Sequence, residues 1–224
     1  MANFSNDAEL MKWEPEVFRL ARIPAQKLAG SGNGVTTAGS AQLTDSGANF
    51  VTAGVKAGHV VKLAKSGVYD LYVPVAGVSS ATQITLEAAG GLFVTQTGVT
   101  YEIHTFDAQH EEAHFELCQR FDITGDGVDQ FAESELCEAR VLRRASAFRV
   151  LEVIFRAEAN ETGDLFWQKA QVYGELFATA VEAAKVRFDR DADGVADTTR
   201  SGHSVRLRVE EEGDAWPGPK SGGE

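Results

Sequence analysis

The chain has few cysteines, few basic residues and no long apolar run, and each shortage excludes a class of protein. Cys118 and Cys137 are the only cysteines among 224 residues, so we expect reduced packing thiols rather than a disulfide framework. The chain has 21 Lys and Arg residues against 33 Asp and Glu residues, which gives a net charge of −12. This balance argues against a sequence-reading nucleic-acid binder, because phosphate neutralisation needs clustered basic residues.

Other patterns are missing as well. No stretch approaches the ~20 apolar residues of a membrane span, so we expect no membrane partner. Residues 1–10 are polar and lack the basic and apolar regions of a signal peptide, so we expect none. The chain contains no G-x-S-x-G, no P-loop and no G-x-G-x-x-G after a strand. We therefore assign no catalytic or cofactor-binding residue and expect no enzyme.

The hydrophobic period changes twice along the chain, which predicts an α+β fold. Residues 34–105 alternate between apolar and polar positions or run β-branched between turn signals, as in a small antiparallel β-barrel or sandwich. Residues 1–33 predict short N-terminal helices, with Gly30 as a stop and residues 30–34 as a flexible linker. Residues 106–200 show the 3.6-residue period of a helical body built on a long antiparallel hairpin. Residues 201–224 read as an extended C-terminal arm.

His110, Glu111 and His114 match the H-E-x-x-H pattern of zinc metalloproteases, with Glu133 as a third ligand to consider. On a helix, residues i and i+4 share a face and can hold one ion. We decide against this zinc hydrolase, because a metalloprotease helix carries apolar residues between its ligands, whereas Glu112 follows the base here. A solvated acidic helix face explains the pattern better.

Two acidic loops resemble calcium-binding loops. The first begins at Asp122 and has Asp129 where an apolar anchor is usual. Its ligand positions are filled by Asp122, Thr124, Asp126, Val128, Gln130 and Glu133, with Gly127 at the turn. The second loop repeats half of the pattern, with Arg200 in the place of the closing Glu. Its acidic positions are Asp189, Asp191, Asp193 and Asp197. Structural Ca²⁺ and plain Asp-Gly turns both explain these loops, and both readings stay open.

Three segments resemble parts of the virion connector proteins of tailed bacteriophages. Residues 7–18 look like the opening of such proteins, and residues 43–61 resemble the small β-modules of phage structural proteins. The predicted hairpin, from about residue 135 to 187, is similar to the body of head-to-tail adaptor proteins. The chain is thus identified as resembling the head-to-tail adaptor (connector, head-completion) family.

The resemblance implies a structural protein of the virion neck, assembled in the host cytoplasm. The family forms a ring, here a dodecamer of identical subunits, between the portal protein and a stopper or tail-terminator protein. Packaged DNA passes through such a ring without sequence-specific binding, and an acidic wall suits that passage. Val205, Leu207 and Val209 in the arm are the residues that we expect to add a strand to a partner. The alternative reading is a calcium-dependent binding module with EF-hand-like loops.

Overall fold

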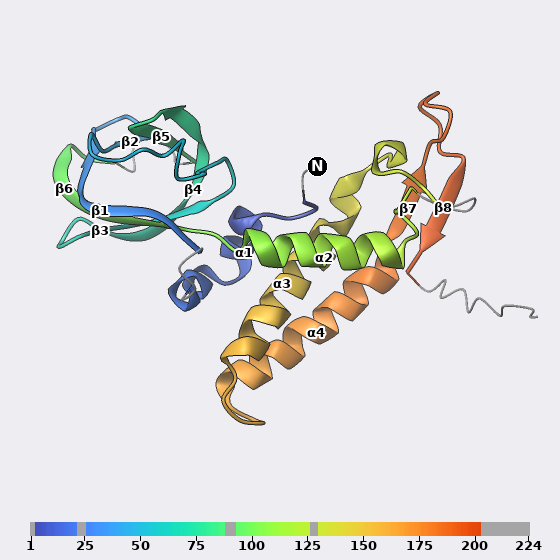
Figure 1. Cartoon of the computed structure of the whole chain (residues 1–224). Helices are drawn as coiled ribbons and strands as arrows, with labels where there is room; N and C mark the ends of the chain where they lie inside the picture. Colours follow the sequence, from blue (N-terminus) through green and yellow to red (C-terminus); the bar gives the residue numbers. More distant parts are fainter. Residues whose placement is uncertain (1–2, 22–25, 88–92, 126–129, 203–224) are drawn as a thin grey trace, which may run out of the picture.

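The structure is a computed structural model, and it describes residues 3–21, 26–87, 93–125 and 130–202. Its fold is α+β, with a closed barrel of six strands at one end and a group of helices at the other (Figure 1). Within the described residues, no helix is long and apolar enough to cross a membrane. The expected mixture of a β-module and helices is confirmed.

The barrel is antiparallel throughout, with strand order β1-β2-β5-β4-β3-β6 and β6 pairing back onto β1. Its strands are β1 (Lys27–Thr36), β2 (Gln42–Thr44), β3 (Val60–Lys65), β4 (Tyr69–Ser80), β5 (Gln83–Leu86) and β6 (Gln96–His104). Alternate residues such as Val61 and Leu63 on β3 point into the barrel core, together with Ile84 on β5. Closure pairs both edges of the sheet, so no strand edge is left to aggregate.

The expectation of a flexible linker at residues 30–34 is wrong, because this glycine-rich run lies inside β1. A Cβ atom at Gly30 would stand 2.9 Å from the carbonyl oxygen of Tyr101, and one at Gly34 would stand 2.8 Å from that of Val99. Both carbonyls belong to β6. Glycine is therefore required at these positions because the two paired strands approach each other closely. Close backbone approach, and not only flexibility, can explain a glycine in a sequence.

The helical part contains four α-helices and three short 3₁₀ segments among the described residues. The elements are α1 (Asp7–Trp13), η1 (Pro15–Leu20), α2 (Asp107–Arg120), η3 (Glu133–Glu135), η4 (Ala139–Leu142), α3 (Arg143–Glu158) and α4 (Leu165–Ala183). Local sequence explains two of their starts. The Asn6 side chain accepts a hydrogen bond from the Glu9 amide and caps α1, and Pro15 is the first residue of η1.

The N-terminal segment belongs to the core of the helical part. Phe4, Leu10 and Phe18 are buried in one apolar cluster with residues of α2, α3 and α4. Phe106, directly after the last barrel strand, lies in the same cluster and packs against Phe18 with ring centroids 5.6 Å apart. The chain therefore leaves the helical part before the barrel and re-enters it after the barrel at neighbouring points of the same core.

Helices α3 and α4 pack along each other. Phe155 contacts Phe166 near the start of α4, whereas Arg149, earlier in α3, lies over the ring of Phe177 further along α4. The Arg149 guanidinium donates to Glu116 on α2 and to Glu152 on its own helix, at 2.6 and 2.8 Å. The buried Glu152 carboxylate needs this positive partner, which explains the inward arginine.

A two-stranded sheet follows α4 and was not expected from the sequence. Its strands are β7 (Lys185–Phe188) and β8 (Thr198–Ser201), and the acidic loop 189–197 joins them. Most of the predicted arm, including Val205, Leu207 and Val209, lies outside the described residues.

Candidate functional site

The two histidines of the H-E-x-x-H pattern have separate partners. His110 uses both ring nitrogens, with Nδ1 2.8 Å from Ser5 Oγ and Nε2 3.3 Å from Asp7 Oδ1. His114 lies one turn further along α2 and bonds to Glu133 instead. A metal shared by both histidines would need one His110 nitrogen to leave its partner, Ser5 or Asp7. The expectation of a wholly solvated face is also wrong, because His110 is fully buried.

Ser5, His110 and Asp7 have the residue types of a catalytic triad but form a buried structural network. In a triad, Nε2 of the histidine faces the serine, whereas here Nδ1 does. Ser5 is also 2.7 Å from Ser146 Oγ on α3, and Asp7 accepts a hydrogen bond from the Phe106 amide. All of these side chains lie in the interior. The network thus ties the N-terminal segment to α2 and α3.

A second histidine site lies one turn further along α2. His114 Nε2 is 2.6 Å from Glu133 Oε1 and 3.5 Å from Cys118 Sγ, and Cys118 Sγ is 3.8 Å from the same Glu133 oxygen. His114 and Cys118 are one turn apart on α2, and Glu133 begins η3. Three different metal-ligand types therefore converge from two elements.

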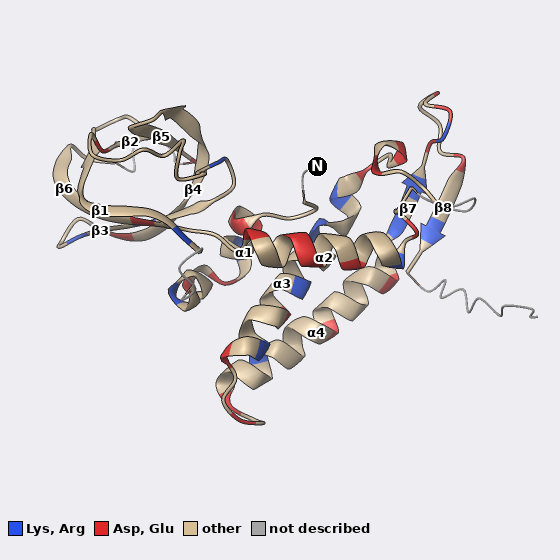
Figure 2. Cartoon of the chain, viewed as in Figure 1, with Lys and Arg blue, Asp and Glu red and all other residues tan. Residues whose placement is uncertain are grey.

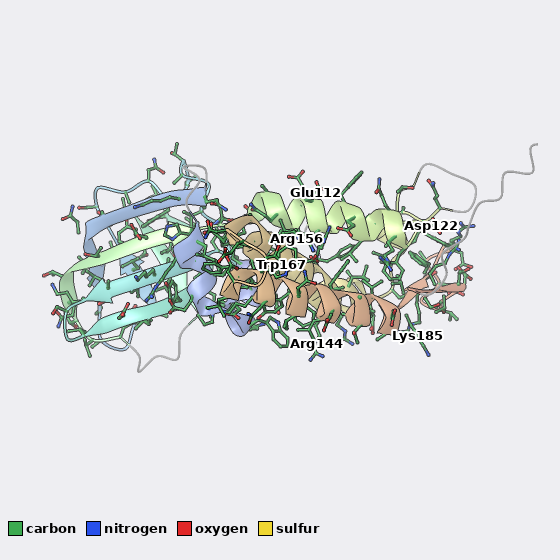
Figure 3. All side chains as sticks on the ribbon, turned by 90° about the horizontal axis from the view of Figure 1, so that it is seen from below. Glu112, Asp122, Arg144, Arg156, Trp167 and Lys185 are labelled. Atoms are coloured by element: carbon green, nitrogen blue, oxygen red, sulfur yellow. The ribbon has the colours of Figure 1, made fainter. Side chains whose placement is uncertain are left out.

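These three side chains line an open cavity of about 710 Å³. Phe115, Ile123 and Ala132 form apolar parts of its wall, and Glu112, labelled on α2 in Figure 3, also lines it. Burial and the negative charge of Glu133 raise the pKa of the Cys118 thiol to about 12. The thiol is therefore protonated at neutral pH unless a cation replaces its proton. The Phe4 ring packs on the His114 imidazole, with centroids 4.3 Å apart, and holds its orientation.

The sequence predicted Cys118 to be a packing residue, and Cys118 and His114 were not assigned to one site. The signal was the i, i+4 spacing of a histidine and a cysteine on one helix. Glu133 was considered as a third ligand beside the two histidines and as the closing ligand of the first calcium loop, and distance along the chain hid its contact with Cys118.

A third cluster, formed by Asp7, His59 and Asp107, already holds a positive charge. Lys56 Nζ lies 2.7 Å from Asp107 Oδ2, and His59 Nε2 lies 3.2 Å from the same oxygen. Burial acts to raise the pKa of Asp107, but hydrogen bonds from His59 and Lys56 outweigh it and hold this pKa well below its usual range. The Asp107 carboxylate is therefore already paired with a cationic side chain.

The first predicted calcium loop is only partly visible. Asp126 and Val128 lie outside the described residues. Asp122 has a positive φ of 60° and a carboxylate 3.5 Å from Arg200, and Thr124 is exposed. Glu133, the expected closing ligand, bonds to His114. Two of the expected ligands, Asp122 and Glu133, therefore have other partners among the described residues.

The second acidic loop brings three of its four carboxylates together. Ligand oxygens of Asp189, Asp191 and Asp197 lie within 4.8 Å of one another. The same side chains also accept backbone hydrogen bonds, for example Asp189 from Gly194 at 2.8 Å and Asp197 from Arg190 at 2.7 Å. Asp193 accepts from Val195 and lies outside the trio. The turn chemistry and the convergence of carboxylates coexist in this loop.

The exposed face of α4 carries a row of apolar residues among polar ones, and the helix has few charged residues (Figure 2). Leu165, Val172 and Leu176 have 65%, 53% and 38% of their surfaces exposed. Their spacing of seven and four residues places them in one row on the helix. We call these three residues the α4 stripe. Glu175 and Glu182 are exposed on the same helix.

A basic hollow lies elsewhere on the helical part. It has a volume of about 420 Å³ and combines an exposed Trp13 with the start of α3. Its basic lining residues are Lys12, Arg140, Arg143 and Arg144. Figure 3 shows Arg144 on the edge of the helical part opposite to Glu112. The hollow and the α4 stripe share no residue.

Comparison with known proteins adds no relative: no family model matches the chain, and neither a curated protein nor a solved structure matches it.

Proposed function

We propose that this protein is a structural subunit of the neck of a tailed-phage virion, where copies of it form a ring between the portal and the stopper or tail. The proposal takes the α3–α4 pair as the antiparallel hairpin of an adaptor body. The observation that carries it is the α4 stripe, an apolar row on the outside of the longest helix.

An exposed apolar row on a helix is stabilised when another surface covers it and removes it from water. Burying one Val or Leu side chain from full exposure contributes about 1.5–3 kcal/mol. Single exposed apolar residues are ordinary, but three in one row resemble an interaction face. Enzymes gather such residues in a concave site, whereas this row lies on a convex helix.

The proposed occupant is a second copy of the same chain. Glu175 and Glu182 are exposed on the helix that carries the α4 stripe. The basic hollow offers Trp13 among four Lys and Arg side chains, two of which, Lys12 and Arg143, pair with Glu9 of the same lining. An apolar row on a helix with exposed Glu residues and a hollow with an excess of basic side chains are complementary in charge. Because the two surfaces use different residues, the contact is heterologous, and heterologous contacts close into rings when the rotation permits.

The remaining parts follow from the resemblance to adaptor proteins. Twelve copies are proposed, with the portal on one side, a stopper or tail-terminator protein on the other and packaged DNA in the channel. The net charge of −12 favours free passage of DNA. The arm of residues 201–224, with Val205, Leu207 and Val209, is proposed to add a strand to a neighbour. The barrel projects from the helical part and is free to brace adjoining proteins (Figure 1).

The experiment compares Val172→Glu with Val51→Glu in ring assembly on purified cognate portal rings, measured by co-sedimentation. Val172 lies in the α4 stripe, whereas Val51 lies in the barrel with a similar exposed fraction, 62%. Both variants expose the same new charge, and both should fold, because neither site is buried.

We expect Val172→Glu to reduce co-sedimentation at least tenfold and Val51→Glu to match the wild type. Equal assembly by the two variants would remove the α4 stripe from the interface and with it the main support for the proposal.

A further inference from the structure

We infer that His114, Cys118 and Glu133 form a binding site for a zinc-like divalent cation, with an open fourth position toward the cavity beside α2. This site differs from the H-E-x-x-H reading, which needs His110 as a ligand. It also stands apart from the proposed neck function, since it needs no second subunit.

The geometry of the three ligand atoms supports the inference. In a tetrahedral zinc site with ordinary bond lengths, sulfur lies about 3.5 Å from a nitrogen or oxygen ligand, and nitrogen lies about 3.3 Å from oxygen. The Cys118 sulfur lies 3.5 Å from His114 Nε2 and 3.8 Å from Glu133 Oε1. Two edges of the tetrahedral face are therefore already near their required lengths.

The third edge is short, because His114 and Glu133 share a hydrogen bond of 2.6 Å. Binding must open this distance by about 0.7 Å to reach the tetrahedral value. Glu133 is the first residue of the short segment η3, and its side chain is part-buried. A small rotation of that side chain is sufficient, and the helix that carries the other two ligands need not move.

The ligand types select the class of metal. One thiolate, one imidazole and one carboxylate suit Zn²⁺ or Co²⁺, whereas Ca²⁺ and Mg²⁺ prefer oxygen alone. Binding replaces the Cys118 thiol proton, which passes to solvent, and His114 binds through Nε2 as a neutral imidazole that carries its proton on Nδ1. The cavity gives a water molecule access to the fourth position. The bound ion would link α2 to the segment that precedes α3.

The test titrates the full chain, stripped with chelator and kept reduced, with Co²⁺ as a spectroscopic substitute for Zn²⁺. Thiolate ligation to Co²⁺ gives a charge-transfer absorption band that oxygen and nitrogen ligands do not give. The variant Cys118→Ser removes the sulfur ligand, and Cys137→Ser is the matched control, because Cys137 is the other free cysteine and is exposed. His114→Gln is a second disruptive variant.

We expect one equivalent of Co²⁺ with the charge-transfer band in the wild type and in Cys137→Ser, and no band in Cys118→Ser or His114→Gln. Zn²⁺ at a hundredfold excess over its Kd should raise the Tm of the wild type by about 5–10 °C and that of Cys118→Ser by less than about 1 °C. Circular dichroism of the metal-free variants checks that each is folded.

The inference fails if the wild type shows no band, or if Cys118→Ser binds the metal as tightly as the wild type does. Because ring assembly is not part of the readout, these outcomes leave the neck proposal untouched, and failed assembly leaves the metal site untouched.

Discussion

Replacing His110 with alanine separates the two explanations of the H-E-x-x-H pattern. If His110 were a zinc ligand, His110→Ala would abolish metal binding. In the structure, His110 bonds to Ser5 and Asp7 and has no nitrogen left for a metal. We therefore expect the variant to lose stability and to keep its metal affinity.

The size of the stability loss follows from the contacts that the imidazole makes. A hydrogen bond to a neutral partner contributes about 1 kcal/mol, and one to a charged partner about 1.5–3 kcal/mol. Part of this loss is offset, because Ser5 keeps Ser146 and Asp7 keeps the Phe106 amide. The cavity left by the ring adds to the loss. The free energy of unfolding should fall by about 3 kcal/mol, which lowers the Tm by roughly 6–12 °C in a chain of this size.

Thermal unfolding followed by circular dichroism measures this change, with Glu112→Ala as the control. Glu112 is exposed on the same helix, so its substitution should change the free energy of unfolding by less than about 0.5 kcal/mol. Equal melting of the two variants would refute the buried network. Loss of bound Co²⁺ in His110→Ala while the fold persists would restore the original zinc reading.

Three further predictions concern the barrel, the acidic loop and the C-terminal end. Burial and the hydrogen bond to Asp45 raise the pKa of Tyr101 to about 12. The unfolded chain therefore loses the Tyr101 hydroxyl proton at a lower pH than the folded chain does, and the free energy of unfolding falls as the pH rises from about 10 to 12. Tyr101→Phe should flatten that part of a urea-unfolding series against pH, and an unchanged slope would exclude Tyr101 as its source. If the second acidic loop binds Ca²⁺, calorimetry should detect Ca²⁺ binding to the wild type and at least tenfold weaker binding to Asp191→Asn. No heat of binding from the wild type would mean that these carboxylates only stabilise the turn. Deleting residues 203–224 should leave the Tm within about 2 °C of the wild type and stop incorporation into virions; normal incorporation would show that the arm is dispensable.

The local patterns of the sequence predicted several elements correctly. Alternation predicted β3 and β5, and their closure into an antiparallel module is confirmed by the barrel. Short N-terminal helices were also predicted, and α1 and η1 begin at a local cap (Asn6) and a local proline (Pro15), because capping depends on residues within one turn. Signals of this kind are short in range and can be read directly from the chain.

The features that the sequence did not reveal depend on distant partners. Gly30 and Gly34 read as a linker, since the β6 carbonyls that exclude a side chain there lie about seventy residues away. Cys118 read as a packing thiol until the fold placed Glu133 beside it. The inward turn of Arg149 depends on the Glu116 carboxylate of another helix. A pattern along the chain shows which residues are apolar or charged, but only the folded structure determines which of them are in contact.

The most direct test of the neck proposal is electron microscopy of the wild-type protein mixed with cognate portal rings. The account predicts an added ring on one side of the portal, with twelve repeats of a density whose inner part is helical and whose outer part is the barrel. Portal rings without added density, beside a protein that stays monomeric at every ratio, would contradict it.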